Sequence, residues 1–215
     1  NLFAPSELNE LNAHLDQIVA GGQYVRGAGG REGSIHALSL ISDHAKKIEQ
    51  DERILNCIAG LVNPGIAVFS SKLVTKLPHT DDVCHWHQDD AYFGDSCRSR
   101  CSVWVPLQDT GENNGCLWII PGSHLQGLLP HDGQKDWGTC RRSLREETLD
   151  LSKAIPVAVQ AGSIVILNAL SCHHSKNNST DQTRRAFIVT YQEASADKGG
   201  AQWRILRSSN ALRKV

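Results

Sequence analysis

The sequence predicts a mainly β fold with flanking α-helices, namely an antiparallel β sandwich or barrel with helices packed on its outside. Two observations support this prediction. Residues 1–63 carry apolar residues at helical spacing, whereas residues 66–191 form short segments rich in β-branched and aromatic residues. Helices followed by many strands favour this architecture over an alternating, parallel one. The 215 residues show no linker or internal repeat, so we expect a single domain, 1–215.

Three helices are expected in the N-terminal part, residues 1–63. Residues 5–20 begin with Pro5-Ser6, carry leucine or isoleucine every three or four positions and end at Gly21-Gly22. A glycine-rich loop follows. Ser34 is a suitable cap for a second helix, which carries apolar residues on one face as far as Ile48, and a third helix is expected near residues 52–61.

Six strands are expected in the β core, about residues 66–191. They are short and rich in β-branched or aromatic residues, and turn residues separate several of them. Asn113-Asn114-Gly115 predicts a hairpin turn, because these residues accept positive φ. The expected strands cover residues 66–76, 101–107, 116–120, 155–160, 163–168 and 184–191.

Residues 125–154 interrupt the strand pattern. This segment is polar, contains the charged stretch RRSLREETLD and lacks period-two alternation. A connection of that length within a compact domain is usually functional or disordered. We therefore expect either a lid over a site or a plain surface insertion.

The composition argues against several classes of partner. A formal net charge of −1 gives no sign of a nucleic acid or an anionic membrane as partner. Seven cysteines without a CxxC pair are typical of free thiols in a reducing cytoplasm. The sequence has no signal peptide and no apolar run near ~18 residues, so we expect a cytoplasmic protein without a membrane span. The oligomeric state has no signature in the sequence.

The stretch HWHQDD, residues 85–90, gathers side chains that bind metals. Side chains alternate along a strand, so His87 and Asp89 are expected on one face and Gln88 on the other. One imidazole nitrogen and one carboxylate oxygen at that separation can hold a divalent ion. His173 or His174, in LSCHHSKNNS, can supply a second imidazole. Two histidines and one carboxylate on one side of a metal form the facial triad of non-haem Fe(II) oxygenases.

Other interpretations of this stretch remain open. A lone His-x-Asp pair is common, and His87 could be a hydrogen-bonded structural histidine. His85 shares the expected face of His87 and Asp89, but three ligands in a line along one strand do not readily form a facial set, so we interpret it as a neighbour. Asp90 is expected on the opposite face, bonded to loop backbone.

An anion site is indicated by TRRAFIVTY, residues 183–191. On a strand, Arg184 shares a face with Ala186 and Ile188, whereas Arg185 lies on the other face. An arginine directed into an apolar interior is costly unless it is paired, and a ligand carboxylate held by two parallel hydrogen bonds would pair it. Alternatively, both arginines face solvent at the start of the strand.

Three segments together resemble a known family. They are HWHQDDAYF, SVWVPLQDTGENNGCLWIIPGSH and AGSIVILNALSCHHSKNNSTDQTRRAFIVTY. In this order they are similar to the phytanoyl-CoA dioxygenase family of Fe(II)/2-oxoglutarate-dependent oxygenases, over about residues 66–191. The resemblance implies a double-stranded β-helix, a jelly roll of the cupin kind.

The resemblance also implies roles for individual residues. His87, Asp89 and His173 match the metal ligands, with His174 in place of the glycine that usually follows the distal histidine. Arg184 lies eleven residues after His173, the family's spacing for the arginine that binds 2-oxoglutarate. The positions implied near this cosubstrate are Gln88, Trp104 and Ser175.

The implied activity is hydroxylation of a C–H bond in a small molecule, using Fe(II), 2-oxoglutarate and O2 and releasing succinate and CO2. The carboxylate of Asp89 favours hydroxylation over halogenation, because the resembling halogenases have a small residue at that position. The same chemistry could instead lead to desaturation, epimerisation or ring formation. A non-catalytic, cupin-like binding protein is the alternative from a different class.

Overall fold

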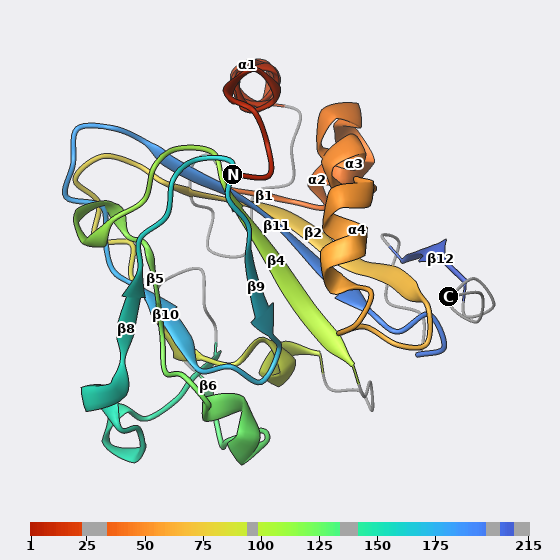
Figure 1. Ribbon diagram of the computed structural model, residues 1–215. Helices are drawn as coiled ribbons and strands as arrows, with labels where there is room; N and C mark the ends of the chain where they lie inside the picture. The colour runs from red at the N-terminus through yellow and green to blue at the C-terminus, as the bar shows by residue number, and fades with distance from the viewer. Residues whose placement is uncertain (23–33, 94–98, 134–141, 197–202, 209–215) are drawn as a thin grey trace.

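Two antiparallel sheets form the body of the protein, as a computed structural model shows for residues 1–22, 34–93, 99–133, 142–196 and 203–208 (Figure 1). The larger sheet has six strands in the order β1-β2-β11-β4-β9, with β12 also paired to β2. The smaller sheet has four, in the order β3-β10-β5-β8. Every pairing within them is antiparallel. The predicted mainly β jelly-roll fold with flanking helices is therefore confirmed.

The strands of the larger sheet are built around β2 and β11, which pair over most of their length. Their bounds are β1 (Ile35–His36), β2 (Ile66–Lys76), β4 (Arg100–Pro106), β9 (Val165–Asn168), β11 (Arg184–Gln192) and β12 (Arg204–Arg207). The strands of the smaller sheet are short. They are β3 (Cys84–His87), β5 (Leu117–Ile119), β8 (Ile155–Val157) and β10 (His173–Ser175). A separate two-stranded ribbon joins β6 (Asp132–Gly133) to β7 (Arg142–Ser143).

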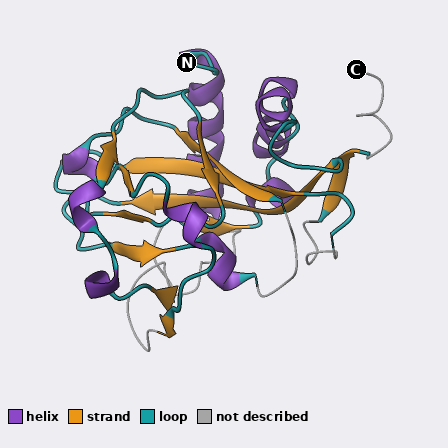
Figure 2. Cartoon of the chain, turned by 60° about the horizontal axis from the view of Figure 1, so that its bottom comes forward, coloured by secondary structure: helices purple, strands orange, loops and turns teal. Residues whose placement is uncertain are grey.

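Four α-helices lie on the outer side of the larger sheet (Figures 1 and 2). They are α1 (Pro5–Gly21), α2 (Leu38–Ile41), α3 (Asp43–Glu49) and α4 (Glu52–Ile58). Short 3-10 turns η1 to η5 cover Asp89–Tyr92, Glu112–Asn114, Ser123–Gln126, Glu146–Thr148 and Leu151–Lys153. None of the helices in the described ranges is long and apolar enough to cross a membrane.

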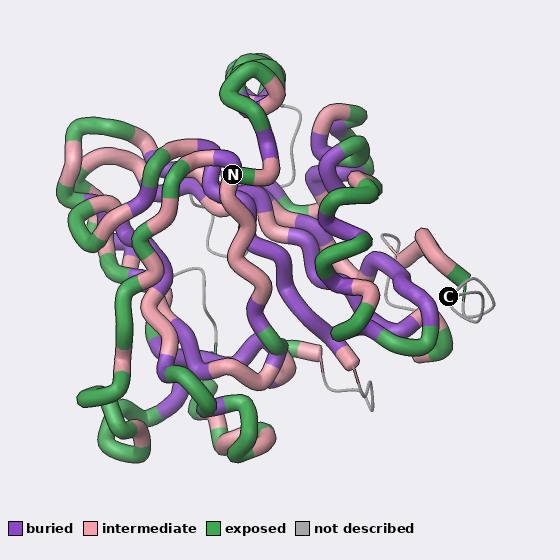
Figure 3. The backbone as a smooth tube through the Cα atoms, viewed as in Figure 1, coloured by how far each residue is buried: buried purple, intermediate pink, exposed green. Residues whose placement is uncertain are grey.

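The larger sheet has two chemically different faces. Its outer face carries Val103, Val105, Phe187 and Val189, which pack with apolar side chains of α1 and α4 in the main hydrophobic core. Its inner face carries Trp104 and other side chains that pack against Leu117 of β5 and so join the two sheets. The buried stretches of β2, β4 and β11 run through the centre of Figure 3. The alternation of side chains thus separates a dry core from the interior between the sheets.

The predicted second helix is wrong in its extent. Residues 35 and 36 instead form β1 and pair with β2, and Ala37, at φ 56°, separates them from α2. Ser34 does not cap a helix, because its hydroxyl accepts a hydrogen bond from the Thr75 amide at 3.2 Å. Ser42 caps α3 by accepting from the Ala45 amide. Tertiary pairing with the long strand β2 has overridden a helical spacing of apolar residues.

The predicted hairpin at residues 113–115 is also corrected. The strands on either side, β4 and β5, belong to different sheets, and the turn between them is η2 followed by Gly115 at φ 79°. The expectation of positive φ therefore holds at Gly115 only. The turn carries the chain from one sheet to the other.

Residues 125–154 lie beside the smaller sheet as far as they are described. Leu144 is buried there, and its amide donates a hydrogen bond to the Trp86 carbonyl of β3 at 2.7 Å. Part of the segment, residues 134–141, falls outside the described residues. A lid function for this segment stays a prediction.

The prediction of free thiols fails at one position. Cys57, Cys101, Cys116 and Cys172 are free, but Cys84 is disulfide-bonded. The remaining cysteines fall outside the described residues.

Gly162 fixes the N-terminus to the end of β4. Its carbonyl accepts hydrogen bonds from the amides of Leu2 and Phe3, at 2.7 and 2.9 Å, and its amide donates to Pro106. Gly162 has φ 79°, and an added Cβ would lie 2.4 Å from the Phe3 carbonyl oxygen. Both the backbone angle and the contact therefore require glycine here.

Gly162→Ala should lower the free energy of unfolding by at least ~2 kcal/mol, because the left-handed backbone conformation alone costs ~1–2 kcal/mol and the clash adds to it. Urea unfolding measures the change. Gly60→Ala is the matched control, since an added Cβ there meets nothing within 4 Å. Equal destabilisation of both variants would contradict the proposed role of Gly162.

Candidate active site

Two histidines face each other across the smaller sheet. His87 at the end of β3 and His173 at the start of β10 are paired in register, and their ring centroids lie 4.1 Å apart. In each ring Nδ1 donates a hydrogen bond to a carbonyl two residues earlier, His85 at 2.8 Å or Ser171 at 2.9 Å. Because a carbonyl can only accept, Nδ1 carries a proton in each ring, and Nε2 is the nitrogen whose lone pair a neutral ring would offer to a ligand.

Asp89, the third member of the cluster, lies in a 3-10 turn and not in the strand that the sequence predicted. β3 ends at His87, Gln88 is extended, and Asp89 is the first residue of η1 rather than part of the strand. Its Oδ2 accepts a hydrogen bond from Ser102 Oγ of β4 at 2.6 Å, and Ser102 in turn contacts Thr190 at 3.1 Å. The carboxylate is therefore held by the larger sheet, whereas both imidazoles belong to the smaller one.

The three side chains converge on one point. Asp89 Oδ1 lies 3.8 Å from His87 Nε2 and 4.0 Å from His173 Nε2. One donor atom from each residue lies within 4.8 Å of the others, and all three residues are buried. Two imidazole nitrogens and one carboxylate oxygen from one side suit a divalent transition metal such as Fe(II). The residues present therefore fit the metal that the resemblance implies.

The electrostatics favour the ligating forms of these groups. Burial lowers the pKa of His87, and the neighbouring His173 lowers it further, so the imidazole stays neutral. Burial alone would raise the pKa of Asp89, but His173, Lys72 and His87, with the Ser102 hydroxyl, outweigh it and hold that pKa below its usual range. A neutral imidazole and an ionised carboxylate are the forms that bind a metal.

The adjacent candidates lie elsewhere. His85 is exposed and is not part of the triad. His174 borders the cavity, but its ring stacks on Trp86 with centroids 4.2 Å apart. Asp90 does not merely bond loop backbone as expected, because its carboxylate also pairs with Arg100 at 2.8 Å.

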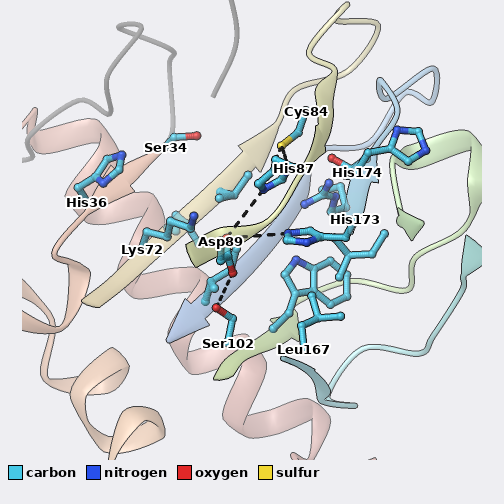
Figure 4. A pocket seen from close by; sticks show the side chains of 17 residues that line it. Ser34, His36, Lys72, Cys84, His87, Asp89, Ser102, Leu167, His173 and His174 are labelled. Atoms are coloured by element: carbon cyan, nitrogen blue, oxygen red, sulfur yellow. Dashed lines mark hydrogen bonds and ion pairs between the residues drawn. The ribbon is translucent and has the colours of Figure 1, made fainter. Parts of the chain in front are cut away.

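A cavity extends from the triad between the two sheets (Figure 4). Apolar side chains, among them Val74, Leu117 and Ile188, make up part of its wall. Trp104 and Ser175, both expected near a cosubstrate, line it as well. The full lining is Ser34, His36, Lys72, Leu73, Val74, Cys84, His87, Asp89, Ser102, Trp104, Leu117, Leu167, His173, His174, Ser175, Arg184 and Ile188.

Arg184 and Arg185 lie on opposite faces of β11. Arg184 lines the cavity and is 2% exposed, and its guanidinium lies 5.8 Å from the Trp104 ring centroid. Arg185 instead reaches the outer side and pairs with Asp16 of α1 at 2.7 Å. The structure therefore places Arg184, and not Arg185, in the cavity with the triad.

The Arg184 guanidinium is only partly satisfied. Nη2 donates to the Gly115 carbonyl at 2.6 Å and Nε to the Asn114 carbonyl at 3.4 Å, but Nη1 is buried without a hydrogen-bond partner. Burial lowers the pKa of Arg184 to about 10, which leaves it charged at neutral pH. A buried, charged nitrogen with an open donor fits a ligand carboxylate such as one end of 2-oxoglutarate.

Gln88 makes other contacts than those expected near a cosubstrate. Its side-chain amide donates to the carbonyls of Gly127 and Leu170, at 2.8 and 2.7 Å, and its oxygen accepts from the Leu129 amide at 2.8 Å. It does not line the cavity. The fully buried Gln88 side chain braces the loops around η1.

Sequence reasoning missed two residues of the site, Ser102 and Lys72. Ser102 had a usable signal, because it lies two positions before Trp104 on the same strand and hence on the same face. Lys72 had no such signal, because nothing in the sequence shows which face of its strand lies toward the cavity.

Relatives of known sequence support the assignment to a family. Phytanoyl-CoA dioxygenase 1 of Oryza sativa subsp. japonica is 28% identical over 178 residues, covering 78% of this chain and 58% of that protein. Phytanoyl-CoA dioxygenase domain-containing protein 1 of Bos taurus is 30% identical over 168 residues, covering 75% and 56%. The chain thus spans somewhat more than half the length of these relatives.

Solved structures share the fold. The non-heme monooxygenase ThoJ in its apo form superposes with a TM-score of 0.80 at 26% identity, covering 97% of this chain and 78% of that one. The epimerase SnoN, in complex with Fe3+, alpha ketoglutarate and nogalamycin RO, has a TM-score of 0.75 at 24% identity, covering 92% and 78%. At the identity of SnoN the likeness concerns the fold alone.

The family match extends beyond the β core. The model of the family described as Phytanoyl-CoA dioxygenase (PhyH) matches residues 1–186, which is most of the 215-residue chain. The helical N-terminal part is therefore included, as well as the two ligand-bearing segments. The chain belongs to the phytanoyl-CoA dioxygenase family.

Proposed function

We propose that this protein is a non-haem Fe(II)/2-oxoglutarate-dependent dioxygenase that hydroxylates a C–H bond of a small molecule. The observation that carries the proposal is the meeting of two imidazoles and one carboxylate in the same cavity as a buried arginine with an open donor. A purely structural role for the histidines would not account for the buried arginine in the same cavity. A non-catalytic, cupin-like binding protein would not require both the three candidate metal ligands and Arg184.

His87, Asp89 and His173 would hold Fe(II), and Arg184 would pair with the far carboxylate of 2-oxoglutarate. When bound together, Fe(II) and 2-oxoglutarate supply the oxidising chemistry that cleaves a substrate C–H bond with O2 and releases succinate and CO2. Ser175 and Trp104 line the same cavity and would border the cosubstrate.

The remaining contributions of the chain are positioning and exclusion of water. The carbonyls of His85 and Ser171 fix both imidazoles with Nε2 toward Asp89. Ser102 holds one carboxylate oxygen of Asp89 and leaves Oδ1 directed at the histidines. The apolar wall lowers the local dielectric constant, which strengthens charge pairing at Arg184.

His87→Ala should reduce metal-dependent succinate formation from 2-oxoglutarate by at least about a hundredfold, because one of three ligands is lost. Binding of Fe(II) by anaerobic calorimetry should weaken in parallel. His85→Ala is the matched control, two residues away on the same strand but exposed. If His87→Ala released succinate like the parent, the proposed metal centre would be wrong. A separate analysis of the product formed by the parent distinguishes hydroxylation from desaturation, epimerisation or ring formation.

Arg184→Met should raise the KM for 2-oxoglutarate about 30-fold or more, since losing one partner of a buried charge pair costs ~2–5 kcal/mol. Arg185→Met, which removes the adjacent arginine on the outer face, should leave this KM within about twofold of the parent. Steady-state succinate formation measures both variants, and urea unfolding checks that each is folded. A larger effect from Arg185→Met would reverse the assignment.

Acid should destabilise the metal-free protein. Burial lowers the pKa of His87 and lowers that of His174 to about 4, whereas both lie near ~6.5 in the unfolded chain. The unfolded chain therefore takes up protons below pH ~6.5 that the folded chain does not, so stability is complete above pH ~6.5 and falls toward pH ~4. Each histidine contributes up to ~2 kcal/mol, less at the partly exposed His174, so we expect a loss of about 3 kcal/mol between pH ~7 and ~5, measured by urea unfolding with EDTA present. His174→Gln should flatten this dependence, and a dependence equally steep in that variant would exclude His174 as a cause.

A further inference from the structure

The cavity contains a second cation, Lys72, that the proposed function does not use. Lys72 lies on β2, lines the cavity and is half-buried. Figure 4 shows its side chain reaching from the β2 side toward Asp89 and His87, with His36 and Ser34 farther out on that side. Its ammonium group makes no hydrogen bond and no ion pair within 4.0 Å among the described residues, although its backbone pairs with β1 and β11. Its charge nevertheless acts on the Asp89 carboxylate and lowers its pKa.

Register places Lys72 to the side of the line between the triad and Arg184. Ile188 of β11 is paired with Trp104 on one side and with Lys72 on the other, and Lys72 is paired with His36. One row of side chains therefore crosses the sheet from β4 to β1. Lys72 is two strands away from Trp104, about 10 Å at the usual strand spacing.

Arg184 is displaced in the other direction, along the strand. It precedes Ile188 by four residues, about 13 Å of extended chain, and is paired with Lys76 rather than with Lys72. The cavity thus has two cationic ends on one sheet, one reached along β11 and one reached across it. A single cosubstrate stretched from the triad to Arg184 would leave the Lys72 end open.

Charge balance favours an anion at this open end. Fe(II), ionised Asp89, doubly negative 2-oxoglutarate and protonated Arg184 together carry no net charge. Lys72 then adds one positive charge that no described side chain of the cavity pairs, and the partly apolar wall strengthens its attraction for an anion. Exposed His36 marks where this end meets solvent, so an anionic group can reach Lys72 from outside.

We propose that Lys72 binds an anionic group, a carboxylate or a phosphate, of the primary substrate, which enters between Lys72 and the triad from the β1–β2 side. This inference rests on the proposed function, because it treats the Arg184 end as the cosubstrate site. Ile188 and the other apolar residues of the wall would contact the organic part of the substrate. The substrate class is then a small organic anion.

Binding of matched probes to the Fe(II)- and 2-oxoglutarate-loaded protein, without O2, tests this by calorimetry. The probes are hexanoate against hexanamide, and hexyl phosphate against hexanol. At least one anion should bind the parent about tenfold more tightly than its neutral partner, and Lys72→Met should remove that advantage. Lys72→Arg should retain it, and Lys47→Met, which removes an exposed lysine on α3, should not change it. The better-bound anion distinguishes a carboxylate from a phosphate substrate.

Three results with the probes would overturn the proposal, and a fourth concerns 2-oxoglutarate. They are equal binding of the charged and neutral probes, an advantage that survives in Lys72→Met, and no binding of either anion at millimolar concentration. A loss of 2-oxoglutarate affinity in Lys72→Met as large as that in Arg184→Met would also overturn it, because Lys72 would then belong to the cosubstrate site. Titration of the parent with 2-oxoglutarate comes first. If that titration shows no binding, the proposed function fails, whereas normal binding followed by any of the results above rejects the role of Lys72 alone.

Discussion

The hydrogen bond from Ser102 to Asp89 is the contact on which the site depends. His87 and His173 come from the smaller sheet and are aligned by ordinary strand pairing, so their spacing follows from the backbone. Asp89 has left the strand and has no such guide. The 2.6 Å contact with β4 fixes the carboxylate relative to the larger sheet, opposite the two histidines of the smaller one. The site is therefore a product of how the sheets pack and not of either sheet alone.

The buried charge of Arg184 opposes the stability of the fold around the cavity. Arg184 is nearly inaccessible, and main-chain carbonyls at residues 114 and 115 satisfy only part of its guanidinium. Gly115 itself has no room for a side chain, because an added Cβ would lie 2.7 Å from both the Lys176 carbonyl oxygen and the Lys76 side chain. The unpaired, buried Nη1 of Arg184 lowers the stability of the ligand-free protein. Unpaired groups of this kind are common at sites where a ligand completes the hydrogen bonding. Stability on the outer face comes from a separate apolar core shared with α1 and α4.

Much of the fold followed from local sequence pattern. β2 and β11 are long and rich in β-branched residues, and their predicted bounds agree with the structure to within one residue. Residues 34–48 did not follow, because apolar spacing that suits a helix was overridden by pairing of Ile35 and His36 with β2. Of the candidate site, His87 and Asp89 followed from their motif and the resemblance selected His173 and Arg184 over their neighbours, but the strand geometry assumed for Asp89 was wrong. Lys72 depends on which face of β2 lies inward, and that is fixed by contacts between residues far apart in the sequence.

The opposite directions of Arg184 and Arg185 have a consequence for how such a protein can change. A single residue inserted or deleted within β11 would turn every following side chain to the other side, sending Phe187 and Val189 between the sheets and Ile188 and Thr190 under the helices. Such a change is tolerated only where a β-bulge absorbs the extra residue, as the register shift of β2 opposite Thr190 and Tyr191 does, whereas single replacements keep the alternation. New chemistry on β11 is therefore expected to arise by replacement of side chains at a constant strand length, with insertions confined to the loops that connect the strands.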